Sequence, residues 1–469
     1  MKKYLLILAA TVAALAWSCQ KDNGSEGGKT TPEPPTAITL STESISAERA
    51  GGDFPVTITA PARPSVSAKP DWVSVVDGTF NKETYKMTLT LKVAAYGVYG
   101  SREGEVTIKS GSLTKTLKIS QKGREKPVMP DVDIDDELVT DGATAEAQVL
   151  YNYLLANYGK KTISGIMANV NWNHDEADKV GKAVGKYPAL NCYDFIHILY
   201  SGANWINYSD ITPVTEWADA GGIVCLMWHF NVPNVEGGSE HTCTPGNGQK
   251  NSEGTWTTTF RAQNVFTEGS WESVWFYDQL DKVAEVILKL QEAGIAAIWR
   301  PFHEAAGNYY ALNYKGSAWF WWGYDGPDVY KRLWNTMQDY FYAKGIRNLI
   351  WVWTAQDYNG DPSAYDNDKP FYPGDDRVDI VGRDIYGKDA DVNLGEFISA
   401  QTAYPNKMIA LSENGKDGST EYGLMSEVWQ AGAQWSWFMP WYGASMCSTA
   451  WWKDALSCES VITRDQVNL

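Results

Sequence analysis

Two patterns of apolar and polar residues divide this chain. Between residues 37 and 123, apolar and polar side chains alternate in short runs such as 54–59 and 85–93, which is the period of half-buried β-strands. Residues 105–120 contain two such runs around a Ser-Gly-Ser turn, the signal of a β-hairpin. A segment this short, composed of short strands, predicts a small all-β sandwich.

From residue 137 onward, apolar runs alternate with helical stretches. Stretches such as 272–293, 328–344 and 421–433 have helical spacing, and several end at a Gly, as helices commonly do. The candidate strands are residues 162–167, 189–195, 222–230, 295–302, 348–354, 378–385, 407–412 and 435–441. Eight strands with intervening helices predict an α/β fold, the (β/α)8 TIM barrel. An open doubly wound sheet is the alternative, but it would need a Gly-rich phosphate turn after its first strand, and the first run is followed by none.

The first residues have the pattern of an exported lipoprotein. Lys2 and Lys3 precede an apolar run over residues 4–17 that is too short for a permanent transmembrane helix, and the run ends in Leu-Ala-Trp-Ser before Cys19. Small residues before a Cys are typical of a lipoprotein cleavage site. We therefore expect a signal peptide over residues 1–18 and a lipid on Cys19, with ordinary secretion as the alternative.

Two polar segments separate the predicted parts. Residues 19–36 are rich in Gly, Glu, Lys and Pro and cannot form a core, so they predict a flexible tether. Residues 124–136, rich in Pro and charge, predict a linker between the sandwich, residues 37–123, and the barrel, residues 137–469. The Lys-Asp pair at 21–22 resembles the export signal of lipoproteins displayed outside the cell, which predicts an outer-membrane protein exposed at the cell surface.

Composition narrows the class of substrate. The chain of 469 residues carries a formal net charge of −17, which argues against nucleic acid as a partner, since a phosphate backbone requires a basic face. It contains 22 Trp, and all but Trp17 and Trp72 lie beyond residue 130. An acidic chain whose aromatic residues concentrate in the barrel favours a neutral substrate.

Two glutamates stand at the ends of predicted barrel strands. Glu304 closes the fourth run and Glu413 the seventh, and the C-terminal ends of the strands form the face where barrel enzymes act. Four further candidates stand at the ends of the third, fourth, sixth and eighth runs: His229, His303, Tyr386 and Trp441. Paired carboxylates with histidines and aromatic rings predict glycoside hydrolysis.

A zinc site is the metal alternative. His229 and His303 would supply two nitrogens and Glu304 a third ligand. However, His303 and Glu304 are adjacent, and adjacent residues of a strand point to opposite faces. No His-Glu-x-x-His spacing occurs in the chain. We therefore expect neither a metal ion nor another cofactor.

Four motifs in the barrel segment resemble glycoside hydrolase family 26, most of whose members are endo-β-1,4-mannanases. They are Trp-Arg-Pro-Phe-His-Glu at 299–304, Trp-Phe-Trp-Trp-Gly at 319–323, the stretch 372–386 and Ala-Leu-Ser-Glu-Asn at 410–414. The resemblance implies a (β/α)8 barrel that binds β-mannan and cleaves internal bonds of mannan, galactomannan or glucomannan. It further implies that Glu304 is the acid/base and Glu413 the nucleophile of a retaining mechanism. The family's other matched positions are His229, Trp319 and Tyr386.

One departure from the family pattern concerns Trp319. Family members place this Trp a few residues after the acid/base, whereas residues 305–318 intervene here and contain Tyr309, Tyr310 and Tyr314. We expect this insertion to reshape a sugar subsite.

Two alternatives to a mannanase remain. Xylan or mixed-linkage β-glucan is the alternative substrate, and a non-catalytic surface glycan-binding lipoprotein is the alternative function.

The proposed chemistry sets geometric expectations for the carboxyl groups. The two should lie about 5 Å apart, as in a double-displacement enzyme. Tyr386 should hydrogen-bond Glu413, and Phe302 and Trp319 beside Glu304 should disfavour its charged form.

The remaining candidates should contact the sugar. His229 and His303 are expected to hold hydroxyl groups or to orient the acid/base, and Trp441 is expected to offer a flat ring to the sugar C–H face. Trp435 and Trp437 could share that role or belong to the barrel core.

The sandwich segment resembles a BACON domain, an immunoglobulin-like module of lipoprotein carbohydrate enzymes. The resemblance rests on Trp-Val-Ser-Val at 72–75, Arg-Glu-Gly-Glu-Val-Thr-Ile at 102–108 and Ile-Ser-Gln-Lys-Gly at 119–123. Tyr96 and Tyr99 could hold sugar, but single surface aromatics are common. We therefore expect a stalk.

Overall fold

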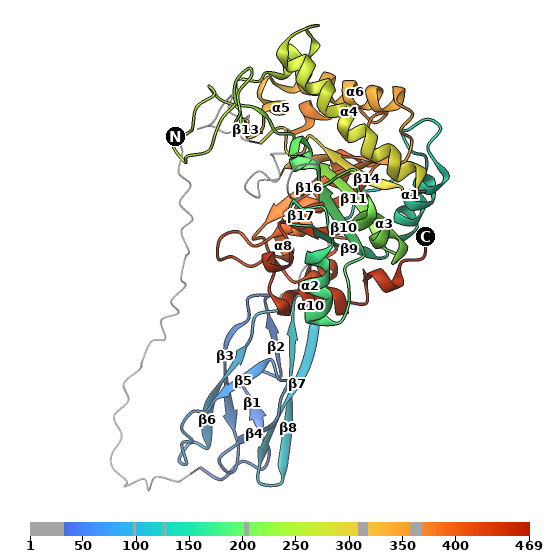
Figure 1. The fold of residues 1–469 in the computed structure, drawn as a ribbon. Helices are drawn as coiled ribbons and strands as arrows, with labels where there is room; N and C mark the ends of the chain where they lie inside the picture. The colour runs from blue at the N-terminus through green and yellow to red at the C-terminus, as the bar shows by residue number, and fades with distance from the viewer. Residues whose placement is uncertain are drawn as a thin grey trace, which may run out of the picture. The chain divides into compact units, whose positions relative to one another are not determined.

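The computed structural model describes residues 32–469 except for 97–99, 124, 126–127, 201–205, 308–317 and 357–367. The chain divides into two compact units, Met1–Lys126 and Pro127–Leu469, whose elements are labelled in Figure 1. The predicted signal peptide and Cys19 lie outside the described residues. Within the described part, no helix combines the length and the apolar composition needed to cross a bilayer.

The first unit is a sandwich of two four-stranded sheets. One sheet contains β1 (Thr39–Leu40), β3 (Gly52–Thr59), β6 (Lys86–Val93) and β5 (Val73–Val76). The other contains β2 (Ser44–Ala47), β8 (Leu113–Gln121), β7 (Arg102–Ser110) and β4 (Ser65–Ala68). Along β6, buried and more exposed residues alternate, and its buried side chains join those of the other strands in one core. The predicted sandwich is confirmed.

Two aromatic side chains of this unit, Trp72 and Tyr96, lie against the same arginine. The guanidinium carbon of Arg102 lies 4.2 Å from the ring centroid of Trp72 and 4.2 Å from that of Tyr96. Arg102 Nη2 also donates to Gln121 Oε1 at 2.7 Å. Arg102 therefore occupies a face of the Tyr96 ring that a sugar would need, while Tyr99 lies outside the described residues. This arrangement favours the stalk over a sugar site.

The second unit is a closed barrel of eight parallel strands. In chain order they are β9 (Thr162–Met167), β10 (Leu190–Asp194), β11 (Ile223–Trp228), β14 (Ala297–Pro301), β15 (Leu349–Gln356), β16 (Ile380–Tyr386), β17 (Met408–Gly415) and β18 (Trp437–Pro440). Each strand pairs with the next, and β9 pairs with both β10 and β18. All eight predicted strands are present, and closure at β9 excludes the open doubly wound sheet.

The strands are apolar because both of their faces are covered. Side chains such as Ile298 and Ile350 fill the barrel interior together with Trp437, whereas Trp435 packs in a second, larger cluster that includes helix side chains. Trp435 and Trp437 are both fully buried. They belong to the core, so they cannot form a floor for a sugar.

Helices surround the barrel (Figure 1). They are α1 (Ala145–Asn157), α2 (Asp175–Val184), α3 (Thr212–Asp219), α4 (Trp271–Glu292), α5 (Trp321–Tyr324), α6 (Pro327–Ala343), α8 (Ala390–Ala403), α9 (Met425–Ala431) and α10 (Thr449–Ser457). Two predicted helices are present within one residue of their expected bounds. The third, expected over residues 421–433, is the shorter α9, which Gly432 ends in the left-handed conformation.

Short elements complete the barrel unit. They are the 3-10 helices η1 (Phe195–Tyr200), η2 (Ala262–Phe266), η4 (Lys369–Phe371), η5 (Ala444–Met446) and η6 (Arg464–Gln466), and the strands β12 (Val232–Pro233), β13 (His241–Thr242) and β19 (Val461–Ile462). The C-terminal ends of the barrel strands and the loops that follow them carry the candidate site.

Candidate active site

The backbone after β14 brings His303 and Glu304 into one pocket. The strand ends at Pro301, and Phe302 (φ 48°) and Glu304 (φ 51°) are left-handed, a conformation that costs free energy in non-Gly residues. Trp322 Nε1 donates to His303 O at 2.8 Å and holds this turn. The expectation that His303 and Glu304 point to opposite faces is therefore wrong, because the strand has already ended and both residues line the same pocket.

Glu413, in β17, is held by two donors. Arg300 Nη2 donates to its Oε1 at 2.7 Å, and the hydroxyl of Tyr386 donates to its Oε2 at 2.5 Å. The predicted hydrogen bond between Tyr386 and Glu413 is present. Both donors stabilise the ionised form of this buried carboxyl group, because charge-assisted hydrogen bonds compensate the loss of water.

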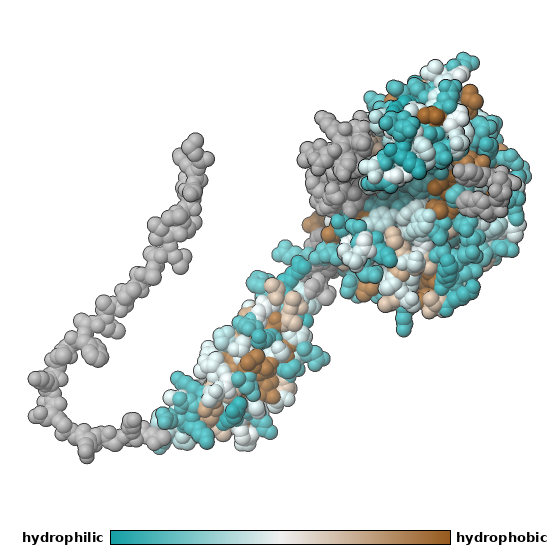
Figure 2. Space-filling view, turned by 60° about the vertical axis from the view of Figure 1, so that its left-hand side comes forward, coloured by the Kyte–Doolittle hydropathy of each residue, from teal (hydrophilic) through white to brown (hydrophobic). Residues whose placement is uncertain are grey.

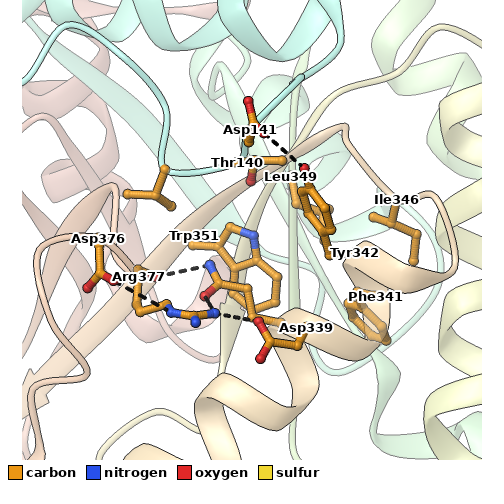
Figure 3. A pocket seen from close by; sticks show the side chains of 12 residues that line it. Thr140, Asp141, Asp339, Phe341, Tyr342, Ile346, Leu349, Trp351, Asp376 and Arg377 are labelled. Carbon is orange, nitrogen blue, oxygen red and sulfur yellow. Dashed lines mark hydrogen bonds and ion pairs between the residues drawn. The ribbon is translucent and has the colours of Figure 1, made fainter.

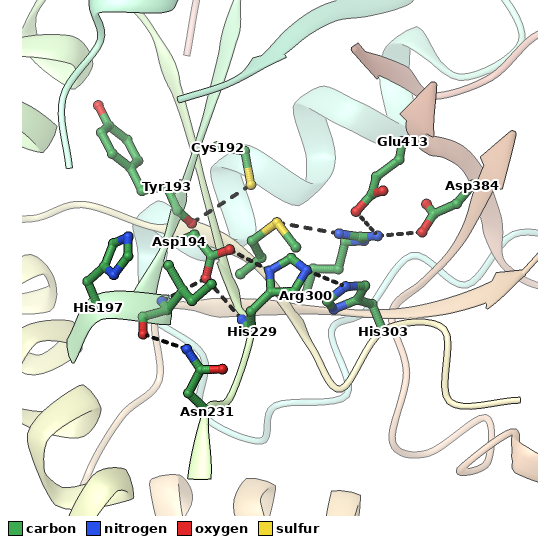
Figure 4. Close-up of polar contacts among 12 residues, drawn as sticks. Cys192, Tyr193, Asp194, His197, His229, Asn231, Arg300, His303, Asp384 and Glu413 are labelled. Carbon is green, nitrogen blue, oxygen red and sulfur yellow. Dashed lines mark hydrogen bonds and ion pairs between the residues drawn. The ribbon is translucent and has the colours of Figure 1, made fainter. Parts of the chain in front are cut away.

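Arg300 connects Glu413 to Asp384, a residue that the sequence analysis did not single out (Figure 4). Its Nη2 lies 2.6 Å from Asp384 Oδ2, and its Nε donates to Thr354 Oγ1 at 2.8 Å. Ser412 Oγ donates to Asp384 Oδ1 at 2.7 Å. Arg300 is thus a buried cation that holds two carboxyl groups from neighbouring strands.

Glu304, Asp384 and Glu413 form a cluster in which one oxygen of each lies within 4.8 Å of the others. Burial and the nearby charges of Asp384 and Glu413 raise the pKa of Glu304 well above its usual value. Burial also raises the pKa of Asp384 to about 7, although the charge of Arg300 opposes the shift. The cluster therefore favours retention of a proton near neutral pH, and Glu304 can carry it.

The same cluster is the group of described residues whose oxygens could together hold a cation. Arg300 already places a positive charge against Asp384 and Glu413, so the donor set has its counter-ion within the protein. The arrangement fits proton transfer better than metal binding.

Two histidines form a relay on the other side of the pocket (Figure 4). His229 Nδ1 lies 2.6 Å from Asp194 Oδ2, and the Nε2 atoms of His229 and His303 are 3.1 Å apart. Because a carboxylate accepts only, His229 Nδ1 carries the proton of its contact with Asp194. Burial lowers the pKa of His303 well below its usual value, so this residue is neutral.

The pocket that contains these groups has a volume of about 470 Å³. Four aromatic side chains line it, Trp319, Phe320, Tyr386 and Trp441. The Trp441 ring centroid lies 5.1 Å from that of His229. Trp319 is 38% exposed, which leaves ring surface for a sugar. Figure 2 shows a hollow that crosses this part of the molecule.

Every predicted site residue of the barrel lines this pocket: His229, His303, Glu304, Trp319, Tyr386, Glu413 and Trp441. Phe302, expected beside Glu304, instead packs against Trp321 and Trp322, and Phe320 takes the place at the pocket. Lys388 and Asp417 also line the pocket and were not predicted. Tyr309, Tyr310 and Tyr314 lie outside the described residues.

Three site residues were not predicted: Asp194, Arg300 and Asp384. They nevertheless share a feature that is visible in the sequence. Each is a charged residue near the C-terminal end of a buried barrel strand, and buried charges need partners.

Each unit matches the sequence model of a known family or domain. The sequence model of glycosyl hydrolase family 26 matches residues 139–466. The BACON model, described as a putative N-terminal binding domain, matches residues 62–122.

Two relatives of this chain carry mannanase names. A mannan endo-1,4-β-mannosidase of Thermothelomyces thermophilus is 31% identical over 72% of this chain and 63% of its own length. Mannan endo-1,4-β-mannosidase A of Piromyces sp is 29% identical over 69% of this chain and 48% of its own length. The chain thus spans between about half and two thirds of the length of these relatives.

Solved structures agree with the sequence models. The GH26 domain of a Prevotella bryantii endo-β-mannanase/endo-β-glucanase is 53% identical, with a TM-score of 0.66, and the match covers 71% of this chain and 100% of that one. A β-mannanase from a symbiotic protist of the termite Reticulitermes speratus, complexed with gluco-manno-oligosaccharide, is 31% identical with a TM-score of 0.58 over 72% of this chain and 99% of that one. The chain therefore belongs to glycosyl hydrolase family 26, with a BACON domain in its N-terminal part.

Proposed function

We propose that the protein is a retaining endo-β-1,4-mannanase that cleaves internal bonds of mannan, galactomannan or glucomannan. The observation that carries the proposal is the pair of carboxyl groups of Glu304 and Glu413, whose oxygens approach within 4.8 Å in an aromatic-lined pocket. Retaining glycosidases keep their carboxyl groups about 5 Å apart, whereas inverting ones leave room for a water at about 6.5–9.5 Å. The relatives named as mannan endo-1,4-β-mannosidases support the choice of substrate.

In the first step Glu413 attacks the anomeric carbon and the glycosidic C–O bond breaks. Arg300 and Tyr386 hold Glu413 ionised and aimed by occupying one oxygen each. Glu304, whose pKa is raised by burial and by its acidic neighbours, donates its proton to the leaving oxygen. A glycosyl ester on Glu413 and a free chain end result.

In the second step Glu304, now ionised, takes a proton from a water that attacks the anomeric carbon of the ester. The C–O bond to Glu413 breaks, and the sugar leaves with its original anomeric configuration. His229 and His303 line the pocket beside the carboxyl groups, and Asp194 fixes the His229 ring. Trp319 and Trp441 offer ring faces to sugar C–H groups.

Hydrolysis of four polysaccharides tests the proposal. Purified protein is incubated with galactomannan, glucomannan, xylan and mixed-linkage β-glucan, and reducing ends are measured. We expect oligosaccharides from the two mannans, with β-configured new ends by proton NMR at early times. Release from xylan or β-glucan alone would assign the barrel to the alternative substrates. Absence of release from all four would favour the glycan-binding lipoprotein.

We also propose that a lipid on Cys19 attaches the protein to the outer membrane, facing outward. The support is the cationic start, the short apolar run and the small residues before Cys19, followed by a polar tether. Expression of the full chain and of a Cys19→Ser variant tests this. The full chain should sediment with outer membranes and be digested by protease added to intact cells, whereas the variant should be released. Equal membrane association of both would overturn the anchor.

A further inference from the structure

Asp194 is a buried carboxyl group behind the catalytic pocket. It is the last residue of β10, is fully buried and does not line the pocket itself. Its Oδ1 accepts hydrogen bonds from Ile196 N at 2.8 Å and from His229 N at 3.0 Å. Its Oδ2 lies 2.6 Å from His229 Nδ1. One oxygen therefore serves the backbone and the other serves the imidazole ring, which lies between Asp194 and His303 in Figure 4.

The two histidine rings meet through atoms of the same kind. The Nε2 atoms of His229 and His303 are 3.1 Å apart, which is a hydrogen-bond distance. Two lone pairs at this distance would repel each other, and two N–H groups would clash. The contact therefore needs one proton, carried by one of the two rings.

The other ring nitrogen of His303 decides which ring carries this proton. His303 Nδ1 is buried and has no hydrogen-bond partner among the described residues. Burial keeps the pKa of His303 well below its usual value, so the ring holds a single proton. If Nε2 accepted, that proton would stand on Nδ1 as a buried N–H without an acceptor, which costs free energy. His303 therefore donates at Nε2 and keeps only a lone pair at Nδ1.

We propose that Asp194 is a positioning residue that acts on His303 through His229. The carboxylate holds the proton of His229 on Nδ1, so that His229 Nε2 accepts from His303 and both rings keep one tautomer. His303 precedes Glu304, which has a left-handed backbone with φ 51°. A displaced His303 ring would therefore displace the carboxyl group of Glu304. The effect on catalysis rests on the proposed function, whereas the placement of the protons does not.

An Asp194→Asn variant inverts the arrangement at almost constant side-chain size. The amide oxygen is needed by the N–H groups of Ile196 and His229, so the NH2 group faces His229 Nδ1. His229 Nδ1 must then accept, and its proton moves to Nε2. His303 Nε2 must accept in turn, and its proton moves to the unpartnered Nδ1.

Nitrogen-15 NMR of histidine-labelled protein measures this arrangement, because the chemical shift of an imidazole nitrogen shows whether it carries a proton. The chain contains five histidines, and the signals of two are assigned with His229→Gln and His303→Gln. At neutral pH the wild type should show protonated Nδ1 in His229 and protonated Nε2 in His303. Asp194→Asn should exchange the two nitrogens in both rings. A wild-type His303 protonated at Nδ1, or unchanged tautomers in Asp194→Asn, would overturn the proposal.

Asp379 offers a matched control at the opposite end of the barrel. It is also a buried aspartate, but its partners are the backbone N–H groups of Val139 and Trp351. Both of these residues line a cavity of about 250 Å³, drawn in Figure 3, whose described lining contains no histidine. Asp379→Asn should therefore leave all histidine signals unchanged. If it produced the same exchange of tautomers, the exchange would reflect a general loosening of the barrel and the proposal would fail.

A double-variant cycle tests whether Asp194 acts through His229. In Asp194→Asn, kcat on mannan should fall about tenfold to a hundredfold, as expected when a reacting group is misplaced by about 1 Å. In a His229→Ala background, the same substitution should cause no further loss. An equal loss in both backgrounds would overturn the route through His229. Absence of mannan hydrolysis by the wild type would overturn the proposed function instead, while the NMR result would still decide the placement of the protons.

Discussion

Two buried aspartates lie near opposite ends of strand β16 and make different contacts. Asp379 precedes the strand at the N-terminal end of the barrel, and Asp384 lies near its C-terminal end. Burial raises the pKa of each to about 7. Asp379, however, accepts hydrogen bonds from Val139 N and Trp351 N, both at 2.7 Å, and joins two chain segments.

Asp384 faces other titratable groups instead. It pairs with Arg300 and shares the cluster with Glu304 and Glu413. A raised pKa therefore does not identify the reacting end of the barrel, since burial produces it at both ends. What distinguishes the catalytic end is the contact between several ionisable groups in a pocket that a substrate can enter.

The largest effect should come from removing a carboxyl group at the catalytic end. Glu304→Ala and Glu413→Ala should each lower kcat on mannan by at least about 10⁴-fold while the melting temperature changes little. Azide should partly restore turnover of Glu413→Ala with inverted product, because the anion takes the place of the nucleophile. Wild-type turnover in either variant would contradict the proposed roles.

A smaller loss should follow Asp384→Asn. We expect kcat to fall about 10²-fold, because Arg300 and Glu304 lose a charged partner. The charge of Asp384 raises the pKa of Glu304, so its removal should also shift the alkaline limb of the kcat profile to lower pH. An unchanged limb would show that Asp384 does not act on Glu304.

The matched change at the other end, Asp379→Asn, should affect stability instead. An amide cannot accept with both of its heavy atoms, so Val139 N or Trp351 N loses its acceptor. The free energy of unfolding should drop by about 1–3 kcal/mol, measured by urea denaturation, with kcat unchanged. A loss of kcat that exceeds the loss of folded protein would place Asp379 in the catalytic machinery. The contrast between Asp379 and Asp384 would then be lost.

A second effect at Asp379 concerns the pH dependence of stability. The pKa of Asp379 is raised on folding, so the folded state retains a proton that the unfolded state has already released. Stability from this group is present below its unfolded pKa of about 4 and is lost as pH rises toward about 7. Relative to Asp379→Asn, the wild type should lose up to about 1.4 kcal/mol per pH unit in that window. A difference that grows with pH would contradict this sign.

The sequence by itself was sufficient to predict the barrel strands and the two carboxylate residues at their ends. Apolar runs of strand length, separated by helical stretches, predict the eight barrel strands because their positions depend on local periodicity. Glu304 and Glu413 were predictable because strand ends in such a barrel share one face. Their motifs also identified the family, since the residues stand close together in the chain.

Only the tertiary structure decided which partners these groups have. Arg300 reaches Asp384 and Glu413 across 84 and 113 residues of chain, and such contacts leave no periodic signal. The left-handed turn at Phe302 and Glu304 placed His303 beside Glu304, which a strand period could not predict because packing of Trp322 on the turn stabilises it. The apolar periodicity of a strand depends on neighbouring residues in the chain. The protonation of the site carboxyl groups depends instead on charges that come together only when the barrel closes.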